Sequence, residues 1–422
     1  MSDKRNLKVG FWLGDVSLQH GGISPYALRI LDSLLVGNEP GWTFALLCAE
    51  GSLRDVRQIR KDLYNQIVEI YPVPAPQINR NLWLQRIQRF GLRESLESTV
   101  NSGASFHQKH LKKWIDDLNL DLIHFPTPSP PFPVGEHVPY VVPTLLDVQV
   151  PYIVTIHDVQ EIHFPEYFSP AQRAIRAMHK WQTLDRAGKI IVSFGHVKED
   201  LIKYFNLPES KIHVCPIPFN SISLQAPTPA AARKYNERYA AWVPFLLYPA
   251  QTWRHKNHAL LFEALQSVQR QGQKNLRLVC TGGKNDYYPA LEAQLDKLLL
   301  RDSVLFTGIV AEDELSWLYR NAAAVTIPTE YEAGSFPLFE AIKQGVPVVC
   351  SDVTSLPETI GNRRFVFNPH DAQTLAELIL RIVSDARFRE ENIANSIKQA
   401  ERLSGINAAA YFYAAYRSLL GY

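Results

Sequence analysis

The chain has few cysteines, and their spacing excludes several kinds of site. Its 422 residues include four of them, Cys48, Cys215, Cys280 and Cys350, and no two form a C-x-x-C pair. Three lie in apolar runs that predict strands, so buried free thiols in a reducing compartment are the simplest account. The histidines do not stand at ligand spacing with the cysteines, so the sequence predicts no zinc cluster.

The sequence also lacks a strong charge of either sign and any long apolar run. Its 44 Lys and Arg residues nearly balance its 42 Asp and Glu residues, for a formal net charge of +2, which gives no overall case for nucleic-acid binding. No window approaches the roughly 20 apolar residues that a membrane-spanning helix needs. The apolar run near the N-terminus is broken by Gly10, Gly14 and Asp15 and predicts a first strand rather than a signal peptide. We therefore expect a cytoplasmic protein.

One basic segment stands out from this balanced background. Residues 80–93, RNLWLQRIQRFGLR, hold four arginines and no acid, with Trp83, Ile87 and Phe90 at helical spacing. Such a helix can lie on an anionic membrane surface, or it can be a solvated helix whose apolar side packs on the core. Both interpretations stay open, and the first predicts peripheral contact with the inner face of the plasma membrane.

Short apolar runs that predict strands alternate with amphipathic runs that predict helices along the chain. This alternation is typical of parallel sheets covered by helices on both faces. We predict an α/β protein with two Rossmann-like, doubly wound domains that face each other across a cleft, where the active site should lie. The predicted bounds are 1–220 for the first domain, 221–240 for a linker, 241–404 for the second domain and 405–422 for a terminal helix.

The stretch from Ile327 to Gly361 predicts a strand, a loop, a helix and another strand. Pro337 occupies a favoured first helical position, and Gly345 ends the helix. The loop and the helix N-terminus follow the carboxyl end of a parallel strand, where such folds bind ligands. Gly334 permits close approach of the backbone, and the N–H groups of Ser335 and Phe336 at the helix start favour an anion.

Two acids flank this loop: Glu332 lies within it and Glu340 on the first turn of the helix. An acid beside a phosphate site would repel the phosphate, so we expect both to face neutral hydroxyls. The hydroxyls of a ribose and a hexose, one on each side of a diphosphate, meet that requirement. The alternative is that Glu332 is solvated and Glu340 merely favours the helix start.

A basic turn follows the apolar strand 245–249. Arg254, His255 and Lys256 lie between this strand and a helix that begins near Ala259. The helix dipole and the fixed cations favour a diphosphate. The alternative interpretation is a charged surface loop.

The first half of the chain has two weaker candidates. Gly21 and Gly22 precede a helix and can present backbone N–H groups to a phosphate or a sugar, although they can equally form a simple tight turn. His157 and Asp158 follow the strand 152–156. His157 can exchange a hydrogen bond with a sugar hydroxyl, or it can simply bond to Asp158.

Together these segments resemble a known family. The run EYEAGSFPLFEAIKQGVPVVCSDVTSLPE, in which seven residues separate Glu332 from Glu340, resembles the E-x7-E signature of family 4 retaining glycosyltransferases, which have the GT-B fold. The basic turn and the run VTIHDVQEIHFPEYFS are also similar to that family, so the resemblance covers nearly the whole chain. Two departures stand out: the chain reads Glu-Ala-Gly-Ser-Phe-Pro where members usually read Glu-Gly-Phe-Gly-Leu-Pro, and Gln251 stands where they usually have arginine.

The resemblance implies a role for each candidate. Glu332 would bind the donor sugar, Glu340 the ribose, and Arg254 and Lys256 the leaving diphosphate. The other implied donor contacts are Gly21, Gly22, Thr307, Gly308, Gly334, Ser335, Phe336, Pro337 and Leu338. His157 would contact the donor sugar or the acceptor, and Asp158 would bind the acceptor. The last helix would return to the first domain through Ala408, Tyr411, Ala415 and Leu419.

We therefore predict a retaining glycosyltransferase that moves a sugar from a nucleotide-diphospho-sugar to a hydroxyl of a saccharide or lipid-linked acceptor. The basic turn looks like that of mannosyltransferase relatives in surface polysaccharide synthesis. Fixed cations make a divalent metal unnecessary, no Asp-x-Asp motif is evident, and we expect no cofactor. The alternatives are a sugar-nucleotide epimerase or phosphorylase on the same fold, or a catalytically silent sugar-binding scaffold subunit.

Overall fold

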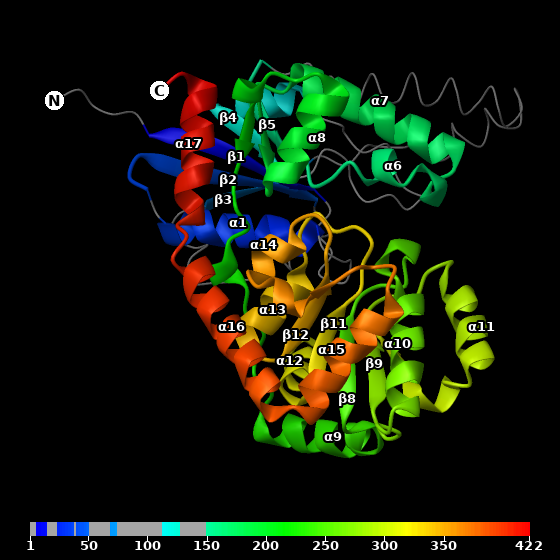
Figure 1. Ribbon diagram of the computed structural model, residues 1–422. Coiled ribbons are helices and arrows are strands. Elements are labelled where there is room, and N and C mark those ends of the chain that lie inside the picture. Colours follow the sequence, from blue (N-terminus) through cyan, green and yellow to red (C-terminus); the bar gives the residue numbers. More distant parts are fainter. Residues whose placement is uncertain (1–5, 15–22, 38, 50–67, 74–111, 127–148) are drawn as a thin grey trace, which may run out of the picture. The chain divides into compact units, whose positions relative to one another are not determined.

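The computed structural model describes residues 6–14, 23–37, 39–49, 68–73, 112–126 and 149–422. The chain divides into two compact units (Figure 1). The first comprises Met1–Ile217 and the terminal segment Ala408–Tyr422, and the second comprises Pro218–Asn407. Gly21, Gly22 and the basic segment 80–93 lie outside the described residues, so the predictions for them stay predictions.

The first unit is built on a seven-stranded sheet whose described strands pair in parallel. The strands are β1 (Leu7–Gly14), β2 (Trp42–Ala49), β3 (Val68–Val73), β4 (Leu122–Phe125), β5 (Tyr152–Thr155), β6 (Lys189–Val192) and β7 (Ile212–Val214). Their spatial order is β3-β2-β1-β4-β5-β6-β7. The direction of winding therefore reverses between β1 and β4, as in doubly wound folds.

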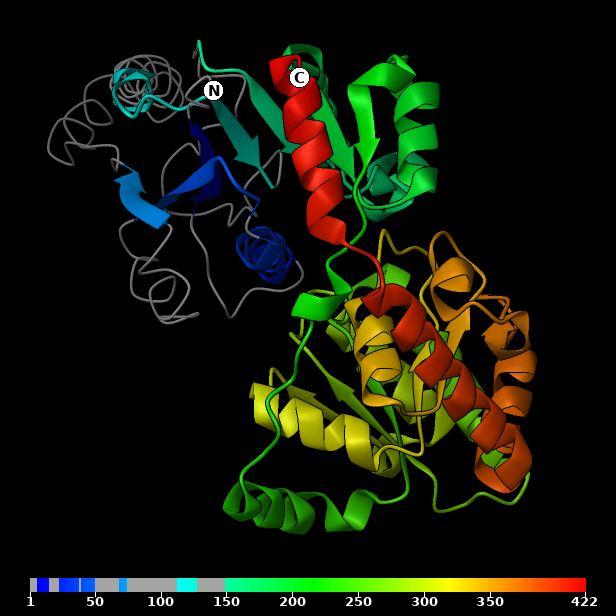
Figure 2. The same cartoon turned by 90° about the vertical axis from the view of Figure 1, so that its left-hand side faces the viewer.

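Helices cover both faces of this sheet. The helices of the unit include α1 (Ile23–Gly37), α6 (Gln160–His163), α7 (Pro170–Arg186), α8 (Gly195–Phe205) and α17 (Ala408–Leu420). Helix α8 packs on the apolar cluster that contains Ile123 and Phe125, whereas His124 between them points to α17. Successive strand residues face opposite sides of a sheet, so α8 and α17 lie on opposite faces (Figure 2).

The terminal helix α17 is an integral part of the first unit. Phe412, Tyr413 and Tyr416 are buried, and the Tyr413 hydroxyl donates to the carbonyl of Leu34 on α1 at 2.9 Å. Tyr411, which we expected to face inward, is instead half exposed. The helix has apolar residues on several sides, so spacing alone did not identify the buried face.

The second unit contains a six-stranded parallel sheet. Its strands are β8 (Phe245–Pro249), β9 (Arg277–Thr281), β10 (Val304–Gly308), β11 (Ala324–Ile327), β12 (Val348–Ser351) and β13 (Val366–Phe367), in the order β10-β9-β8-β11-β12-β13. All four residues of β11 and of β12 are buried, as expected of strands covered on both faces. The winding reverses between β8 and β11, which are direct neighbours.

The helices of the second unit are α9 (Pro229–Tyr239), α10 (His258–Arg270), α11 (Tyr288–Leu298), α12 (Glu312–Asn321), α13 (Phe336–Gln344), α14 (Leu356–Ile360), α15 (Ala372–Ser384) and α16 (Ala386–Ser404). Helix α15 packs beside α10, and α16 packs on α13 and α15. The prediction of two doubly wound parallel α/β domains is thus confirmed.

The segment 221–240, which we predicted to be a linker, belongs to the second unit and contains α9. The Thr228 side chain caps this helix by accepting from the Ala231 N–H, and Tyr239 is fully buried. Pro229 lies in the first turn, where proline is favoured, and the alanines that follow favour a helix. The composition that suggested a linker therefore also suits a helix.

We predict that Gly282→Ala destabilises the protein more than Gly272→Ala does. Both glycines have φ +110°, but a Cβ at Gly282 would lie 2.7 Å from the backbone carbon of Ala250, whereas nothing lies within 4 Å of a Cβ at Gly272. Both variants carry the same backbone strain from the positive φ. The overlap with Ala250 should therefore make the loss of unfolding free energy about 1–3 kcal/mol larger in Gly282→Ala than in Gly272→Ala. Urea denaturation of both variants measures it, and equal losses would contradict the prediction.

Candidate functional site

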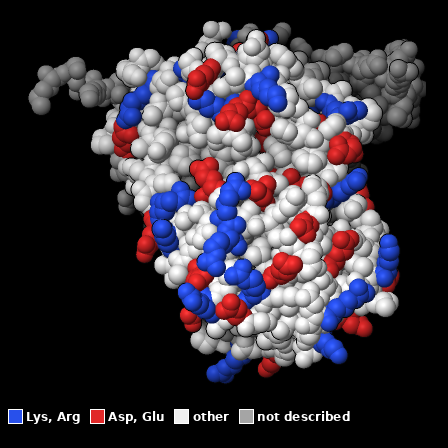
Figure 3. Space-filling model, viewed as in Figure 1, with Lys and Arg blue, Asp and Glu red and all other residues white. Residues whose placement is uncertain are grey.

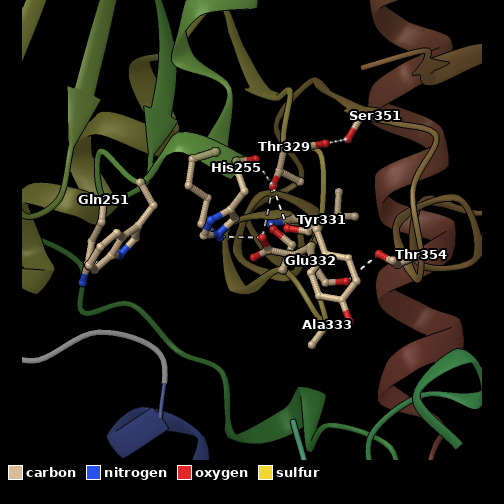
Figure 4. A network of polar contacts seen from close by, with 12 residues as sticks. Gln251, His255, Thr329, Tyr331, Glu332, Ala333, Ser351 and Thr354 are labelled. Atoms are coloured by element: carbon tan, nitrogen blue, oxygen red, sulfur yellow. Dashed lines mark hydrogen bonds and ion pairs between the residues drawn. The ribbon is translucent and has the colours of Figure 1, made fainter. Parts of the chain in front are cut away.

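The site in the second unit lies where the winding of the sheet reverses. The loops after β8 and β11 leave neighbouring strands at the same edge, because parallel strands have their carboxyl ends together. The turn Trp253–Asn257 and the loop 328–335 are therefore brought side by side. Figure 4 shows this region, with Gln251 and His255 from the first loop and Thr329, Tyr331, Glu332 and Ala333 from the second.

Side chains hold the basic turn in a fixed shape. Arg254–Lys256 form one turn of 3₁₀ helix that ends at Asn257, which has the left-handed φ of 56°. The Asn257 amide donates to the carbonyls of Pro328 and Pro369, at 3.1 and 2.8 Å. The buried hydroxyl of Tyr248 donates to the Lys256 carbonyl at 2.8 Å. These bonds fix the direction in which the Lys256 side chain leaves the backbone.

Lys256 and Glu332, which are 76 residues apart in the chain, form an ion pair. Lys256 Nζ lies 2.5 Å from Glu332 Oε2, and their side chains are only 19% and 11% exposed. The sequence predicted that Lys256 binds the diphosphate and that Glu332 binds the donor sugar. The fold brings the two side chains into direct contact. A partly buried pair of opposite charges is screened less by salt than a surface pair.

Three hydroxyl residues for which the sequence predicted no role hold the loop that carries Glu332: Thr329, Ser351 and Thr354 (Figure 4). The Thr329 hydroxyl lies 3.0 Å from the His255 carbonyl and 2.8 Å from the Tyr331 carbonyl, so it bridges the two loops. The Thr354 hydroxyl donates to the Glu332 carbonyl at 2.5 Å. The Ser351 hydroxyl donates to the Thr329 carbonyl at 2.6 Å. Small hydroxyl residues in loops are common, so nothing in the sequence marked these.

Helix α13 begins and ends nearly as predicted. Ser335 is the N-cap and accepts from the Leu338 N–H at 3.4 Å, and Gly345 ends the helix with φ 64°. Phe336 is the first helical residue, which places Pro337 second. The N-terminus of α13 thus lies next to the loop that carries Glu332 and Gly334.

Glu340 is nearly buried on α13, with 8% of its surface exposed. Its Oε2 accepts a hydrogen bond from the Tyr319 hydroxyl of α12 at 2.9 Å. Tyr319 lies 21 residues earlier on another helix, and no sequence pattern links it to the acid.

The other candidate donor contacts of the second unit follow strands of the same sheet. Thr307 and Gly308 end β10, which is separated from β8 by β9, and the Gly308 carbonyl accepts from the Gly282 N–H at 2.9 Å. Arg254 is exposed. Gln251, at the position of the family's arginine, accepts a hydrogen bond from the indole N–H of Trp253 at 2.7 Å. Its amide oxygen thus orients an indole.

In the first unit, His157 follows β5 and packs against the ring of Tyr26 on α1. The ring centroids are 4.7 Å apart and the planes nearly perpendicular. Burial lowers the pKa of His157, although Asp158 and a hydrogen bond to the Pro126 backbone oppose the shift. Its Nε2 has no hydrogen-bond partner among the described residues.

A series of buried polar contacts lies behind His157 in the first unit. His124 lies between the Tyr416 hydroxyl of α17, at 2.8 Å, and the Thr155 hydroxyl, at 2.9 Å. Burial lowers the pKa of His124 to about 3, so the ring is neutral and donates through one nitrogen and accepts through the other. Thr155 also interacts with the Tyr26 hydroxyl, which lies 3.0 Å from that of Ser193. This series of polar contacts connects the terminal helix α17 to Tyr26, whose ring packs on His157.

Asp158 has partners other than His157. Its carboxylate accepts from the Gln160 N–H at 3.2 Å, and no hydrogen bond joins it to His157 among the described residues. Burial tends to raise its pKa, but nearby Lys180 and the Gln160 N–H lower it overall. Lys180 itself is buried and pairs with Glu161 at 2.5 Å. Asp158 is thus a charged acceptor near His157, and its role in acceptor binding stays a prediction.

Charge is mixed over the face of the second unit that Figure 3 shows, where basic and acidic side chains are interspersed. Within the described ranges, no group of three or more His, Cys, Asp or Glu side chains is placed to hold a metal ion. None of the helices in the part of the chain that the structure describes is long and apolar enough to cross a membrane.

Two family models and several known proteins match this chain. Residues 241–399 match the family model for glycosyl transferases group 1, and residues 66–220 match the one for Glycosyltransferase Family 4. The O-antigen chain mannosyltransferase B of Escherichia coli is 29% identical over 63% of this chain and 70% of its own length. The O-antigen chain mannosyltransferase RfbU of Salmonella typhimurium is 28% identical over 57% of this chain and 63% of its own.

Among solved structures, that of Anabaena Alr3699/HepE in complex with UDP and glucose aligns with a TM-score of 0.65 and 17% identity, over 99% of this chain and 100% of that one. WaaG, a glycosyltransferase involved in lipopolysaccharide biosynthesis, aligns with a TM-score of 0.62 and 16% identity, over 96% and 98%. The fold is of the GT-B type, and the two family models define the chain as a glycosyltransferase. The chain belongs to the family 4 and group 1 glycosyltransferases, with a Family 4 domain followed by a group 1 domain.

We predict that His258→Phe weakens the pH dependence of stability. His258 begins α10, and its ring lies between those of Tyr248 and Phe306, at 4.7 and 5.9 Å. Burial, and then the charge of Lys256, lower its pKa from 6.5 to about 3. Between these values the unfolded chain binds a proton that the folded chain does not, so stability falls as the pH drops below 6.5.

Phenylalanine fills a similar space without titrating, so the variant's thermal midpoint should change less than that of the original protein between about pH 7.5 and 5. Scanning calorimetry measures the midpoint. The control is His370→Ala, which removes a histidine that is 73% exposed and lies 4.0 Å from Glu330, and its slope should change less than that of His258→Phe. An unchanged slope in His258→Phe would contradict the prediction.

Proposed function

We propose that this glycosyltransferase moves a hexosyl group, and specifically a mannosyl group, from a nucleotide-diphospho-sugar to a hydroxyl of a saccharide or lipid-linked acceptor. The named relatives that act on O-antigen chains as mannosyltransferases support the choice of sugar. The contact between Lys256 and Glu332 at the edge between β8 and β11 is the observation on which the proposal rests.

A diphosphate that binds Lys256 competes with Glu332 for the ammonium group. The ammonium carries a single charge, and a diphosphate offers a larger negative charge than one carboxylate does. Glu332 then needs new donors, because a buried carboxylate without a partner is costly. The hydroxyls of the donor sugar supply them, since the sugar is attached directly to the diphosphate. Donor binding thus replaces the Lys256–Glu332 ion pair by two contacts: one between Lys256 and the diphosphate, and one between Glu332 and the sugar hydroxyls.

The nucleotide end of the donor lies at α13 in this proposal. Glu340 binds the ribose hydroxyls. The residues Gly334 and Ser335, which lead into α13, provide backbone N–H groups for the diphosphate, and the helix adds a favourable dipole. Thr307 and Gly308 at the end of β10 contact the base. Thr307 and Gly308 end β10, and the loop that leads into α13 follows the end of β11 in the same sheet.

The transfer itself needs no covalent nucleophile. The glycosyl–phosphate bond lengthens, and Lys256 and Arg254 stabilise the charge that builds on the leaving diphosphate. The departing phosphate oxygen takes the proton of the acceptor hydroxyl, which attacks from the same face, so the anomeric configuration is retained. In the first unit, His157 and Asp158 bind the acceptor in this proposal.

Replacing Lys256 by alanine should nearly abolish transfer, and replacing Glu340 by alanine should strongly reduce transfer at low donor concentration, while both variants stay folded. The loss of a donor that stabilises developing charge typically costs about 100- to 1,000-fold in kcat, so Lys256→Ala should fall in that range. Glu340→Ala should act mainly through KM for the nucleotide sugar. The measurement is nucleotide release from GDP-mannose and other nucleotide sugars, with a mannosyl acceptor.

The matched control is Lys198→Ala, which breaks the Lys198–Glu209 ion pair on the surface of the first unit and should leave turnover unchanged. Near-normal transfer in both Lys256→Ala and Glu340→Ala would refute the site. A protein that binds sugar but releases no nucleotide would support the silent scaffold instead.

The product should keep the anomeric configuration of the donor, and chelation should not stop the reaction. Proton NMR of the product from an α-linked donor should show an α-linkage, and activity should persist after treatment with EDTA. The reason is that Arg254 and Lys256 supply the positive charge that a divalent ion supplies elsewhere. A β-linked product would overturn retention, and a loss of activity restored by Mn²⁺ or Mg²⁺ would overturn metal independence.

A further inference from the structure

The carboxylate of Glu340 is held by a residue from a different helix. Glu340 lies on α13, and its Oε2 is 2.9 Å from the Tyr319 hydroxyl on α12, in a buried setting. A glutamate has a broad, nearly two-fold last torsion, so its carboxylate plane is poorly defined by its own rotamer preferences. A hydrogen bond from a fixed donor removes that freedom.

Tyr319 is well placed to be such a donor. It is fully buried, and its hydroxyl also lies 3.3 Å from the Pro337 carbonyl in the first turn of α13. The hydroxyl has one proton, and a carboxylate at the shorter distance is the stronger acceptor. The contact with Pro337 keeps the tyrosine close to the start of α13. The position of the Tyr319 hydroxyl relative to the Glu340 carboxylate is therefore fixed.

The helix that carries Tyr319 is itself anchored from its outer side by α9. Trp317 of α12 stacks on Tyr239 of α9, with ring centroids 5.3 Å apart and planes at 20°. Arg238 and the Tyr239 hydroxyl both donate to the buried carboxylate of Glu314, each at 2.6 Å. Two polar contacts and one ring stack therefore limit the movement of α12, and with it the Tyr319 hydroxyl.

We propose that Tyr319 is a positioning residue that orients the Glu340 carboxylate toward the ribose hydroxyls of the donor. The proposal rests on the assignment of Glu340 to the ribose under the proposed function. Tyr319 touches neither the reacting atoms nor the sugar being transferred, so its removal should weaken recognition of the nucleotide and leave the chemical step nearly unchanged.

The test compares Tyr319→Phe with Tyr239→Phe. Each variant loses one buried hydrogen bond from a tyrosine to a glutamate and keeps the ring, but only Tyr319 contacts Glu340. Calorimetric titration with GDP, UDP and ADP, and with the 2′-deoxy and 3′-deoxy forms of the tightest binder, measures the affinity for the ribose separately from that for the base and phosphates. Thermal midpoints show that both variants are folded.

We expect Tyr319→Phe to weaken binding of the ribonucleotide about tenfold, the size of one charge-assisted hydrogen bond. It should also reduce the preference for the ribonucleotide over the deoxy forms, while kcat at saturating donor stays near the original value. Tyr239→Phe leaves the Arg238–Glu314 contact and the ring stack on Trp317 in place, so α12 stays anchored and the variant should keep both the affinity and the preference. A structural role alone would lower stability in both variants without changing the ribose preference in either.

The variant Glu340→Gln distinguishes a failure of the ribose assignment of Glu340 from a failure of the positioning role of Tyr319. If it keeps the full ribose preference, the assignment of Glu340 fails, and the proposed donor site with it. If it loses the preference while Tyr319→Phe keeps it, the positioning role of Tyr319 is overturned and the donor site stands. Equal losses of preference in Tyr319→Phe and Tyr239→Phe would also overturn the role, because the effect would then come from the packing of α12 as a whole.

Discussion

The ion pair between Lys256 and Glu332 depends on the direction in which the strands run. Because β8 and β11 are parallel neighbours, the loops that follow them leave the sheet at the same edge, and the reversal of winding between them brings those loops together. A lysine and a glutamate delivered to such a partly buried place pair with each other, since either charge alone would be costly. The same attraction makes the lysine a ready partner for a diphosphate.

Acids in this site are held by neutral hydroxyls as well as by charge. The backbone on both sides of Glu332 is fixed by Thr329 and Thr354, and the carboxylate of Glu340 is fixed by Tyr319. These donors come from elements distant in the sequence, and they orient the acids at little electrostatic cost. Orientation matters in a transferase, because small displacements of binding groups reduce the rate strongly.

The first unit uses the same kind of support. His124 joins the terminal helix α17 to β5, and Thr155 and Tyr26 continue the chain to the ring of His157. The last helix of the chain thereby becomes part of the unit that carries the first strands. Both units therefore place a candidate binding residue beyond a strand end and fix it through buried polar contacts.

The alternation of apolar and amphipathic runs determined the two parallel-sheet units, and the local order of strand, loop and helix determined where Glu332, Glu340 and Lys256 would emerge. Such features depend on residues close together in the chain. Contacts between distant segments were decided by the tertiary structure: the Lys256–Glu332 pair, the bond from Tyr319 to Glu340, the buried face of α17 and the helix in place of the expected linker. They depend on which elements pack together, and periodicity and spacing along one chain carry no information about a partner 76 residues away.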